Sequence, residues 1–393
     1  MRLLIRLIAL SVLLLAGSTL TAQEFSSETD TARPNRVLSF NGYLKALPSL
    51  DFTNLTDDVN FNNTLHNRLN FRYSYSNNLF FVLEVRNRLL TGSMVTDYHD
   101  FMKESLKTDN GLVDASFIPA SGKNYIWHIN SDRFYADWRN DNWQVRLGRQ
   151  RINWGINMVS NPNDLFNTYS FFDFDYEERP GADALRIQHY TGDLSRWELA
   201  INPAREAENS VAAMIYAVNT KGIDLQFIAG YYRNRTAVGA GWATHIKKSG
   251  FKGEVTLFNS LSKLDSATVV AAISLDHLFA NGMYGFVEML YNGGNRSGVT
   301  NLLMMTEPMT ADNIFISKYA ITGGVNYAVS PILSASGAAM YMPDLEGFYI
   351  MPSLSWSALT NFDLTFLTQF FQVNQSGSPL RLFRPYLQIK WSF

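Results

Sequence analysis

The chain has 393 residues, no cysteine and a formal net charge of −2 at pH 7. Without cysteine, the chain has neither a disulfide framework nor thiolate metal or redox chemistry, and so mild a charge argues against nucleic-acid binding. Aromatic residues make up 14% of the chain, yet the mean hydropathy is only −0.10. The chain therefore combines many aromatic side chains with an average polarity.

The first residues predict an export signal. Arg2 and Arg6 precede an apolar run over 7–16, which is short for a membrane anchor and of the usual length for a signal-peptide core. We expect residues 1–22 to be a signal peptide. Its removal lowers the number of Lys and Arg from 33 to 31 against 35 Asp and Glu, which leaves a charge near −4. Residues 23–37 follow as a short polar lead-in in the periplasm.

From residue 38 to residue 393, apolar and polar side chains alternate. In 65–75, for example, Phe71 and Tyr73 fall on one face and Arg68 and Arg72 on the other. A period of two residues indicates strands with one apolar and one wet face. No stretch after residue 22 is long and apolar enough for a membrane helix, and lipid tolerates only helices or closed sheets. The expected fold is all-β, a transmembrane antiparallel up-and-down β-barrel over 38–393. A soluble β-sandwich is the alternative.

The alternation and the intervening turn residues predict about eighteen strands. Sixteen is the competing count, because 195–201 and 210–218 show the weakest pattern. The predicted strands are 38–47, 62–75, 79–90, 124–138, 142–150, 182–190, 195–201, 210–218, 222–232, 235–246, 251–258, 267–278, 283–291, 314–329, 332–342, 347–357, 361–371 and 381–393.

Short and long connections alternate along the chain. Short ones such as 140–141 and 281–282 contain the Asn, Asp or Gly that tight hairpins need, whereas 91–123 and 292–313 are long. A start in the periplasm places the short turns there and the long loops outside, and an even strand count leaves both termini periplasmic. Glycines inside predicted strands indicate kinks or bulges. They are Gly239, Gly241, Gly323 and Gly324.

The segment 144–188 is the most distinctive part of the sequence. It contains Gly148-Arg149-Gln150 at a strand end, then Asn153-Trp154-Gly155, and then Arg179-Pro180-Gly181 before the next strand. This pattern resembles the alginate-export-like group of large outer-membrane porins of Gram-negative bacteria. Members of that group carry a similar strand ending in Gly-Arg-Gln, a nearby Trp-Gly and a return that contains Pro-Gly. The match covers about 45 residues, and the remainder matches only as barrel architecture. The resemblance implies an eighteen-stranded channel with loops that fold inward.

The loop 151–181 is both long and aromatic. Phe172, Phe174 and Tyr176 alternate there with acidic residues. In free water these rings would expose an apolar patch. Packing into the barrel mouth would bury them and narrow a lumen that eighteen strands would otherwise leave open and water-filled. We therefore expect 151–181 to form a constriction. The alternative is a surface loop that packs only against its neighbours.

Charged side chains on the predicted inward faces and in this loop are the candidate pore-lining and constriction residues. Arginine cannot lose its charge and binds carboxylate or phosphate in bidentate fashion, so an arginine wall that faces an acidic loop would create a transverse field. Both signs are present, which predicts modest ion selectivity. The alternative is that these charges pair with one another. The candidates are Arg68, Arg72, Glu84, Arg86, Arg88, Arg146, Arg149, Asp164, Asp173, Asp175, Glu177, Glu178, Arg179 and Arg186.

The last strand ends on Phe393. Leu387, Ile389 and Trp391 alternate with polar residues up to this aromatic terminus. The pattern closely resembles the closing strand of bacterial outer-membrane barrels, in which a C-terminal Phe serves as an assembly signal. The resemblance implies that the barrel-assembly machinery is a partner, with outer-membrane lipid and lipopolysaccharide around the barrel.

Signals for enzymatic chemistry are weak. The six histidines show no metal-ligand spacing, and no phosphate-binding or dinucleotide fingerprint is convincing, so we expect no cofactor, no metal and no catalytic residue. The sequence favours a passive outer-membrane porin for small hydrophilic solutes, which include anionic and saccharide solutes, acting as a monomer. A surface-polysaccharide-binding or export barrel with an occluded pore is the alternative, and a barrel enzyme that acts on lipid is the third hypothesis.

Overall fold

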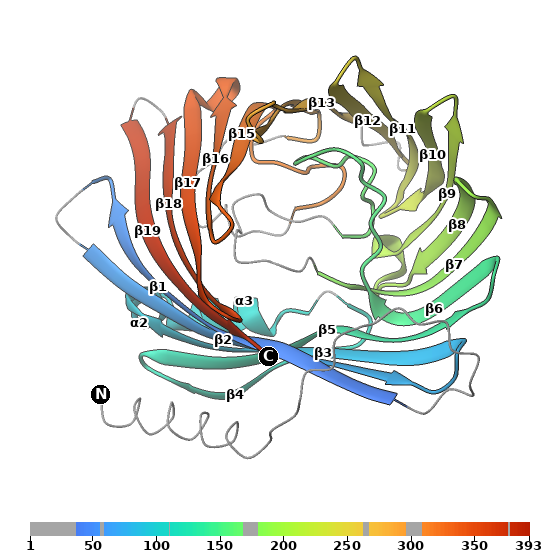
Figure 1. Ribbon diagram of the computed structural model, residues 1–393. Helices are drawn as coiled ribbons and strands as arrows, with labels where there is room; N and C mark the ends of the chain where they lie inside the picture. The colour runs from blue at the N-terminus through green and yellow to red at the C-terminus, as the bar shows by residue number, and fades with distance from the viewer. Residues whose placement is uncertain are drawn as a thin grey trace. The chain divides into compact units, whose positions relative to one another are not determined.

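The computed structural model describes residues 37–55, 59–109, 111–167, 180–261, 267–295, 309–375 and 378–393. Its strands follow one another in chain order around one antiparallel sheet of nineteen (Figure 1). The sheet closes because β1 (Val37–Thr53) pairs with both β2 (Val59–Ser74) and β19 (Ser378–Ser392). β3 (Leu79–Gly92) pairs directly with β5 (Tyr125–Arg139), so β4 is an extra strand beside β5. The closed barrel itself therefore has eighteen strands.

Every predicted strand is present, which confirms the all-β antiparallel barrel of eighteen strands. The competing count of sixteen is wrong, because the two weakest segments, 195–201 and 210–218, are β8 and β9. The remaining strands are β6 (Trp143–Gln150), β7 (Ala182–Gly192), β8 (Ser195–Asn202), β9 (Val211–Thr220), β10 (Ile223–Tyr232), β11 (Arg235–Ile246), β12 (Ser249–Ser260), β13 (Thr268–Leu278), β14 (Tyr284–Asn292), β15 (Tyr319–Ser330), β16 (Leu333–Met342), β17 (Gly347–Leu359) and β18 (Phe362–Gln375).

The two ends of the barrel differ in their connections. At one end, which we call the turn end, short turns such as 221–222 and 247–248 join the strands, and several use left-handed residues that tight hairpins require. At the opposite end, the loop end, most of the connections are long and include 93–124, 151–181 and 293–318. The predicted alternation of short and long connections is thus confirmed for most of the chain, although the loop-end connections 233–234 and β18 to β19 are short.

Side chains alternate between an apolar outer face and a mixed inner face. Phe227, Val238 and Phe366 are 51%, 57% and 54% exposed, whereas the adjacent Gln226 and Ala237 are buried. So much exposed apolar surface around the wall exceeds what a soluble protein carries, and it matches the lipid face of a membrane barrel. Among the residues that the structure describes, no helix is long and apolar enough to cross a membrane.

The long connections contain elements that the alternation does not reveal. The connection after β3 holds α2 (Ser93–Asp97), α3 (His99–Lys107) and β4 (Ser116–Gly122). Two single 3-10 turns, η1 (Ala207–Asn209) and η3 (Pro343–Leu345), lie in other connections. Neither α2 nor α3 has a side-chain cap at its N-terminus, so the usual sequence signal of a helix start is missing.

Two expectations about the strands are wrong. The predicted strand 314–329 begins only at Tyr319, because 314–318 turns into the barrel, where Phe315 and Ser317 are buried. The glycines predicted to mark kinks or bulges keep a regular register in β11 and β15. Each of these glycines instead leaves space beside the sheet, on the inner or the outer face. The four are Gly239, Gly241, Gly323 and Gly324.

Candidate functional site

The connection after β6 enters the barrel and runs along its inner wall. In Figure 1 this green segment lies inside the ring of strands. Residues 151–167, the described part of the connection, make hydrogen bonds to inward side chains of strands from β8 to β14. We call residues 151–167 the lumen loop. Its position agrees with the predicted inward folding of 151–181 and differs from that of a surface loop.

The first anchor of the lumen loop is Glu254 on β12. Its carboxylate accepts hydrogen bonds from the backbone N–H groups of Ile156, Asn157 and Asn163, the latter two at 2.7 and 2.9 Å. Glu254 is only 1% exposed. A buried carboxylate is costly unless it is hydrogen-bonded, and here the backbone of the loop supplies the donors.

The second anchor is Glu288 on β14, which repeats this arrangement. Its two carboxylate oxygens accept hydrogen bonds from the backbone N–H groups of Val159 and Ser160, at 2.8 and 2.7 Å. Between the two anchors, the Ser274 hydroxyl of β13 donates to the Asn157 side-chain oxygen at 2.6 Å. Three neighbouring strands thus hold one turn of the lumen loop.

The start of the lumen loop is fixed by Trp154, whose side chain is buried. The indole N–H donates to Glu198 of β8 at 2.7 Å, and the Trp154 carbonyl accepts from Gln226 of β10 at 2.8 Å. Its ring also meets Phe166 edge to face, with centroids 4.9 Å apart. The Trp-Gly motif of the sequence therefore places an aromatic ring against the inner wall.

Two glycines of β11 make room for the lumen loop. A Cβ atom at Gly239 would lie 2.6 Å from the Asn163 side-chain oxygen, and one at Gly241 would lie 2.9 Å from its nitrogen. Asn163 donates to the Ala240 carbonyl, and its oxygen accepts from the Thr256 hydroxyl. These inward glycines thus allow the loop to approach the strand closely, which is a known role of glycine inside strands besides bulges and bends.

A second inward segment, 309–318, precedes β15. Asn292 donates to the carbonyls of Phe315 and Ser317, and the Tyr232 hydroxyl accepts from the Ala311 N–H. Phe315 and Ile316 belong to the same buried apolar cluster as Ile152 and Trp154 of the lumen loop. The main apolar core of the described barrel therefore lies inside it, where loops pack on the inner wall.

Asp344 in η3 holds the end of this second segment. Its carboxylate accepts from the Ser317 hydroxyl and from the backbone N–H groups of Lys318 and Tyr319. Burial alone would raise the pKa of Asp344, but these hydrogen bonds hold it below the ordinary value of 3.8. The carboxylate is therefore ionised at neutral pH.

The predicted arginine wall lies on β2, β3, β6 and β7. Arg68 and Arg86 sit directly opposite each other on β2 and β3, and Asp132 of β5 bridges them at 2.6 and 3.0 Å. Glu84 binds Arg68 at 2.5 Å. A bulge in β5 brings Asp132 inward, because the register with β3 shifts between Glu84 and Val85. Two like charges are thus neutralised by acids of the same wall.

Two further inward arginines are also paired with acids, and a third contacts a histidine. Arg146 pairs with the buried Asp137 at 2.5 Å, and Arg186 pairs with the buried Glu198 at 2.6 Å. Arg88 contacts the His128 ring nitrogen at 3.0 Å. The alternative that these charges pair within the protein therefore describes most of the described arginines.

Arg72 differs from the other arginines of the wall. It is exposed, and its guanidinium carbon lies 4.1 Å from the centre of the Phe80 ring. A cation over an aromatic face keeps its full charge. Among the described residues no carboxylate forms an ion pair with Arg72, so its charge remains available near the turn end of the lumen.

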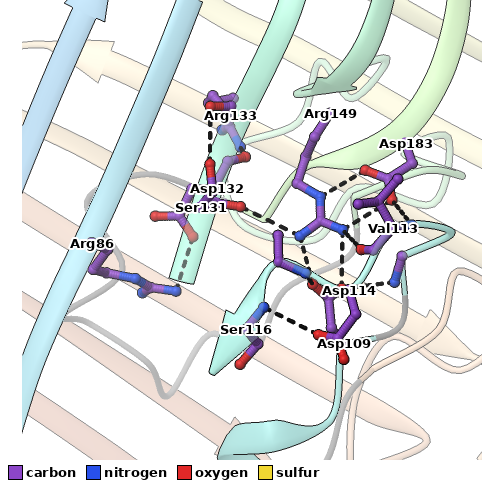
Figure 2. Close-up of polar contacts among 12 residues, drawn as sticks. Arg86, Asp109, Val113, Asp114, Ser116, Ser131, Asp132, Arg133, Arg149 and Asp183 are labelled. Atoms are coloured by element: carbon purple, nitrogen blue, oxygen red, sulfur yellow. Dashed lines mark hydrogen bonds and ion pairs between the residues drawn. The ribbon is translucent and has the colours of Figure 1, made fainter. Parts of the chain in front are cut away.

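Arg149 is committed to contacts within the protein (Figure 2). Its guanidinium donates to both oxygens of Asp183 at 2.6 and 2.9 Å, to both oxygens of Asp109 at 2.7 and 3.1 Å, and to the carbonyls of Val113 and Ser131. All five N–H groups are used, and the side chain is buried. The prediction of Arg149 as a constriction residue is thus replaced by a structural role, which ties the connection after β3 to β6 and β7.

The acidic half of the predicted constriction is only partly described. Asp164 lies in the lumen loop and is buried. The other predicted loop residues lie outside the described residues, so the predicted field across the lumen stays a prediction. They are Asp173, Asp175, Glu177, Glu178 and Arg179, together with the rings of Phe172, Phe174 and Tyr176.

Sequence reasoning missed the residues that position the lumen loop. Glu254 and Glu288 are each the only acid of their strand, while the loop segment 153–163 is rich in Asn. That combination is the available signal, since an isolated inward acid needs buried donors. Within the described ranges, no group of three or more His, Cys, Asp or Glu side chains could hold a metal ion.

Comparison with known proteins supports the fold. No protein-family model and no curated protein matches the sequence. Solved outer-membrane porins are similar in structure. OccAB4 of Acinetobacter baumannii is 7% identical, with a TM-score of 0.54, and the match covers 91% of this chain and 99% of that chain. OccK8 (OprE) and OpdL of Pseudomonas aeruginosa are 10% and 11% identical, with TM-scores of 0.54 and 0.53, and each match covers 91% of this chain and 98% of the other. The likeness shows the closed eighteen-stranded barrel fold of the OprD/Occ porins.

Proposed function

We propose that the protein is a passive porin of the bacterial outer membrane, through which small hydrophilic solutes diffuse. The observation that carries this proposal is the lumen loop, which Glu254 and Glu288 hold against the inner wall by its backbone. An anchored inward loop narrows a barrel of eighteen strands without requiring energy or a cofactor. The 151–181 connection is therefore the constriction of the proposed channel.

The wall that the lumen loop does not cover supplies the polar surface for solutes. The loop binds strands from β8 to β14, whereas the paired arginines and acids lie mainly on β2 to β8. Fixed charges of both signs hydrate a lumen and give modest selectivity, and unpaired arginine favours anions. The ion pairs that Arg146 and Arg186 form with acids support modest selectivity, and the exposed Arg72 supports a slight anion preference.

The same proposal fixes orientation and surroundings. Both termini are periplasmic, because eighteen strands return the chain to its starting side and the long loops face outward. Lipid and lipopolysaccharide surround the apolar wall, and the barrel-assembly machinery recognises Phe393. The barrel acts as a monomer and not as an enzyme. The narrower resemblance of 144–188 to alginate-export-like barrels stays a prediction.

Single-channel recording tests the channel. The refolded protein in a planar bilayer should give discrete conductance steps, with a small anion preference in the reversal potential under a salt gradient. Replacement of 155–161 by a short Gly-Ser linker should raise the conductance, because it removes the anchored turn. Replacement of 205–209, a loop-end connection outside the lumen loop, serves as the matched control and should leave the conductance unchanged.

Two outcomes would contradict the proposal. A folded barrel that shows no conductance would contradict an open channel. It would favour the alternative of a surface-polysaccharide-binding or export barrel with an occluded pore. Equal conductance in the wild type and in the 155–161 variant would show that the lumen loop is not the constriction.

A further inference from the structure

An apolar groove of about 710 Å³ runs over the outer wall from β12 to β17. Its floor follows two neighbouring rows of the ladder. One row joins Leu275, Val287, Gly323, Ala339 and Ile350, each paired with the next across one strand boundary. The other row joins Ser249, His277, Gly285, Val325, Gly337 and Pro352 in the same way. These positions alternate with buried inward residues, so the groove is on the face that we assign to lipid.

Missing side chains create the groove. A Cβ atom at Gly323 would have its nearest neighbour at 3.6 Å, and one at Gly337 at 4.0 Å, so both positions border open space. The strands around them are regular and need no glycine for their backbone. Glycine inside a strand gives up packing, and one recognised reason is the close approach of a ligand.

The groove climbs away from the turn end. Ser249 is the first residue of β12 at that end, whereas Pro352 lies seven residues before the last residue of β17. Seven residues span about 23 Å of strand, or roughly 18 Å along the membrane normal for a tilted strand. This rise is about the thickness of one hydrocarbon leaflet, which is half of roughly 30 Å.

Positive charge marks the lower mouth of the groove. Lys247 and Lys248 form the turn directly before Ser249, and both are exposed. The next turns along this edge, 279–283, 331–332 and 360–361, contain no charged residue. The Ser249 hydroxyl and His277, 3.1 Å apart, add hydrogen-bonding groups at the same mouth.

We propose that this groove binds one phospholipid of the periplasmic leaflet. An acyl chain lies over Gly323 and Gly337, and the phosphate binds Lys247 and Lys248. The inference rests on the proposed outer-membrane location, with the turn end in the periplasm. A second copy of the chain fits less well, because rotation about the membrane normal would bring the two lysine pairs together at the same height.

Native mass spectrometry of the full-length barrel in detergent, titrated with phosphatidylglycerol, tests the site. One molecule should bind to the wild type more tightly than phosphatidylcholine does. The double variant Lys247→Gln/Lys248→Gln should lose roughly thirtyfold in affinity for phosphatidylglycerol, because each lysine near a lipid phosphate contributes about 1 kcal/mol to binding. Gly323→Leu/Gly337→Leu should remove the binding of both lipids, because leucine fills the groove.

Matched controls keep the test independent of folding. Ala229→Leu places a leucine at an exposed position of β10, and Lys221→Gln removes a lysine from another turn at the same end. Both controls should bind phosphatidylglycerol like the wild type. Unchanged binding in Gly323→Leu/Gly337→Leu, or a dimer that this variant abolishes, would overturn the proposal. Conductance of the same samples reports on the channel separately, and the groove variants should conduct normally.

Discussion

At the scale of single residues, Arg149 shows how context decides what a charge does. The sequence placed Arg149 among the candidate pore-lining residues, but two carboxylates and two carbonyls occupy its whole guanidinium fork. Sequence spacing cannot reveal this, because Asp109 and Asp183 lie 40 and 34 residues away along the chain. The buried cluster joins three segments at the loop end.

Loss of Arg149 should destabilise the barrel strongly. Arg149→Ala leaves Asp109 and Asp183 buried without their partner, and breaking a buried pair costs about 3–5 kcal/mol. Arg149→Lys keeps the charge but loses the fork, so it should cost less. The measurement is the free energy of unfolding from denaturant titration in vesicles. Arg139→Ala is the control, because the side chain is 47% exposed and such pairs contribute at most about 1 kcal/mol. Equal losses in the two variants would contradict this role.

The same cluster predicts a dependence on acid. Burial alone would raise the pKa of Asp109, but hydrogen bonds from Arg149 and from the N–H groups of Ala115 and Gly111 hold it below 3.8. A carboxyl whose pKa is lowered on folding contributes stability above its unfolded pKa and loses it as the pH falls through the folded value. The free energy of unfolding should therefore decrease as the pH is lowered below about 4. In Asp109→Asn this fall should be shallower, and an identical pH profile would refute the assignment.

At the scale of elements, the strands were predictable and the loops were not. Alternation locates strands because lipid and lumen impose a period of two, and β8 and β9 are strands although their pattern is the weakest in the sequence. The inward loops follow no such period. Their positions depend on contacts such as Ile156 with Glu254, which are 98 residues apart. One sequence could predict that 151–181 folds inward from its aromatic rings, but not which strands would hold it.

The anchors of the lumen loop should control the conductance. Glu254→Gln/Glu288→Gln places amide donors against backbone N–H groups and removes charge-assisted hydrogen bonds, each worth about 1.5–3 kcal/mol. We expect a higher mean conductance and more current noise, because the loop leaves the wall more often. Glu346→Gln changes an exposed acid at the loop end that binds Asn374, and it should record like the wild type. Quiet, unchanged steps in the double variant would show that the carboxylates do not hold the loop.

Gly148, the one glycine of β6, should be hard to replace. Its φ is +118°, and a Cβ atom would lie 2.3 Å from the Phe134 carbonyl oxygen. Gly148→Ala should therefore cost roughly 1–3 kcal/mol of unfolding free energy, with the strain placed one residue before Arg149. Gly323→Ala is the counterpart with open space, and its effect should stay within about 0.5 kcal/mol. Similar costs for the two changes would argue against backbone strain at Gly148.

At the scale of the whole molecule, closure by β1 and β19 makes the last strand decisive. Residues from Tyr43 to Thr53 pair with β19, so the barrel closes only when β19 is in place. Phe393→Ala should reduce the amount of barrel assembled in outer membranes several-fold and leave the refolding yield in detergent unchanged. Phe366→Ala, an outward aromatic change on β18, should not affect assembly. Normal assembly of Phe393→Ala in cells would remove Phe393 as the signal.

The way in which Glu254 and Glu288 hold the lumen loop has a consequence for how such a barrel diversifies. Both carboxylates bind main-chain N–H groups and make no use of the side chains of Ile156 and Val159, whereas Ser160 also binds Glu288 through its side chain. Substitutions at Ile156 and Val159 can therefore change what the proposed passage admits while the loop keeps its path, whereas proline, which lacks the N–H, is excluded. In the proposed channel the scaffold therefore separates architecture from specificity, so new solute preferences are accessible through single exchanges at these two positions.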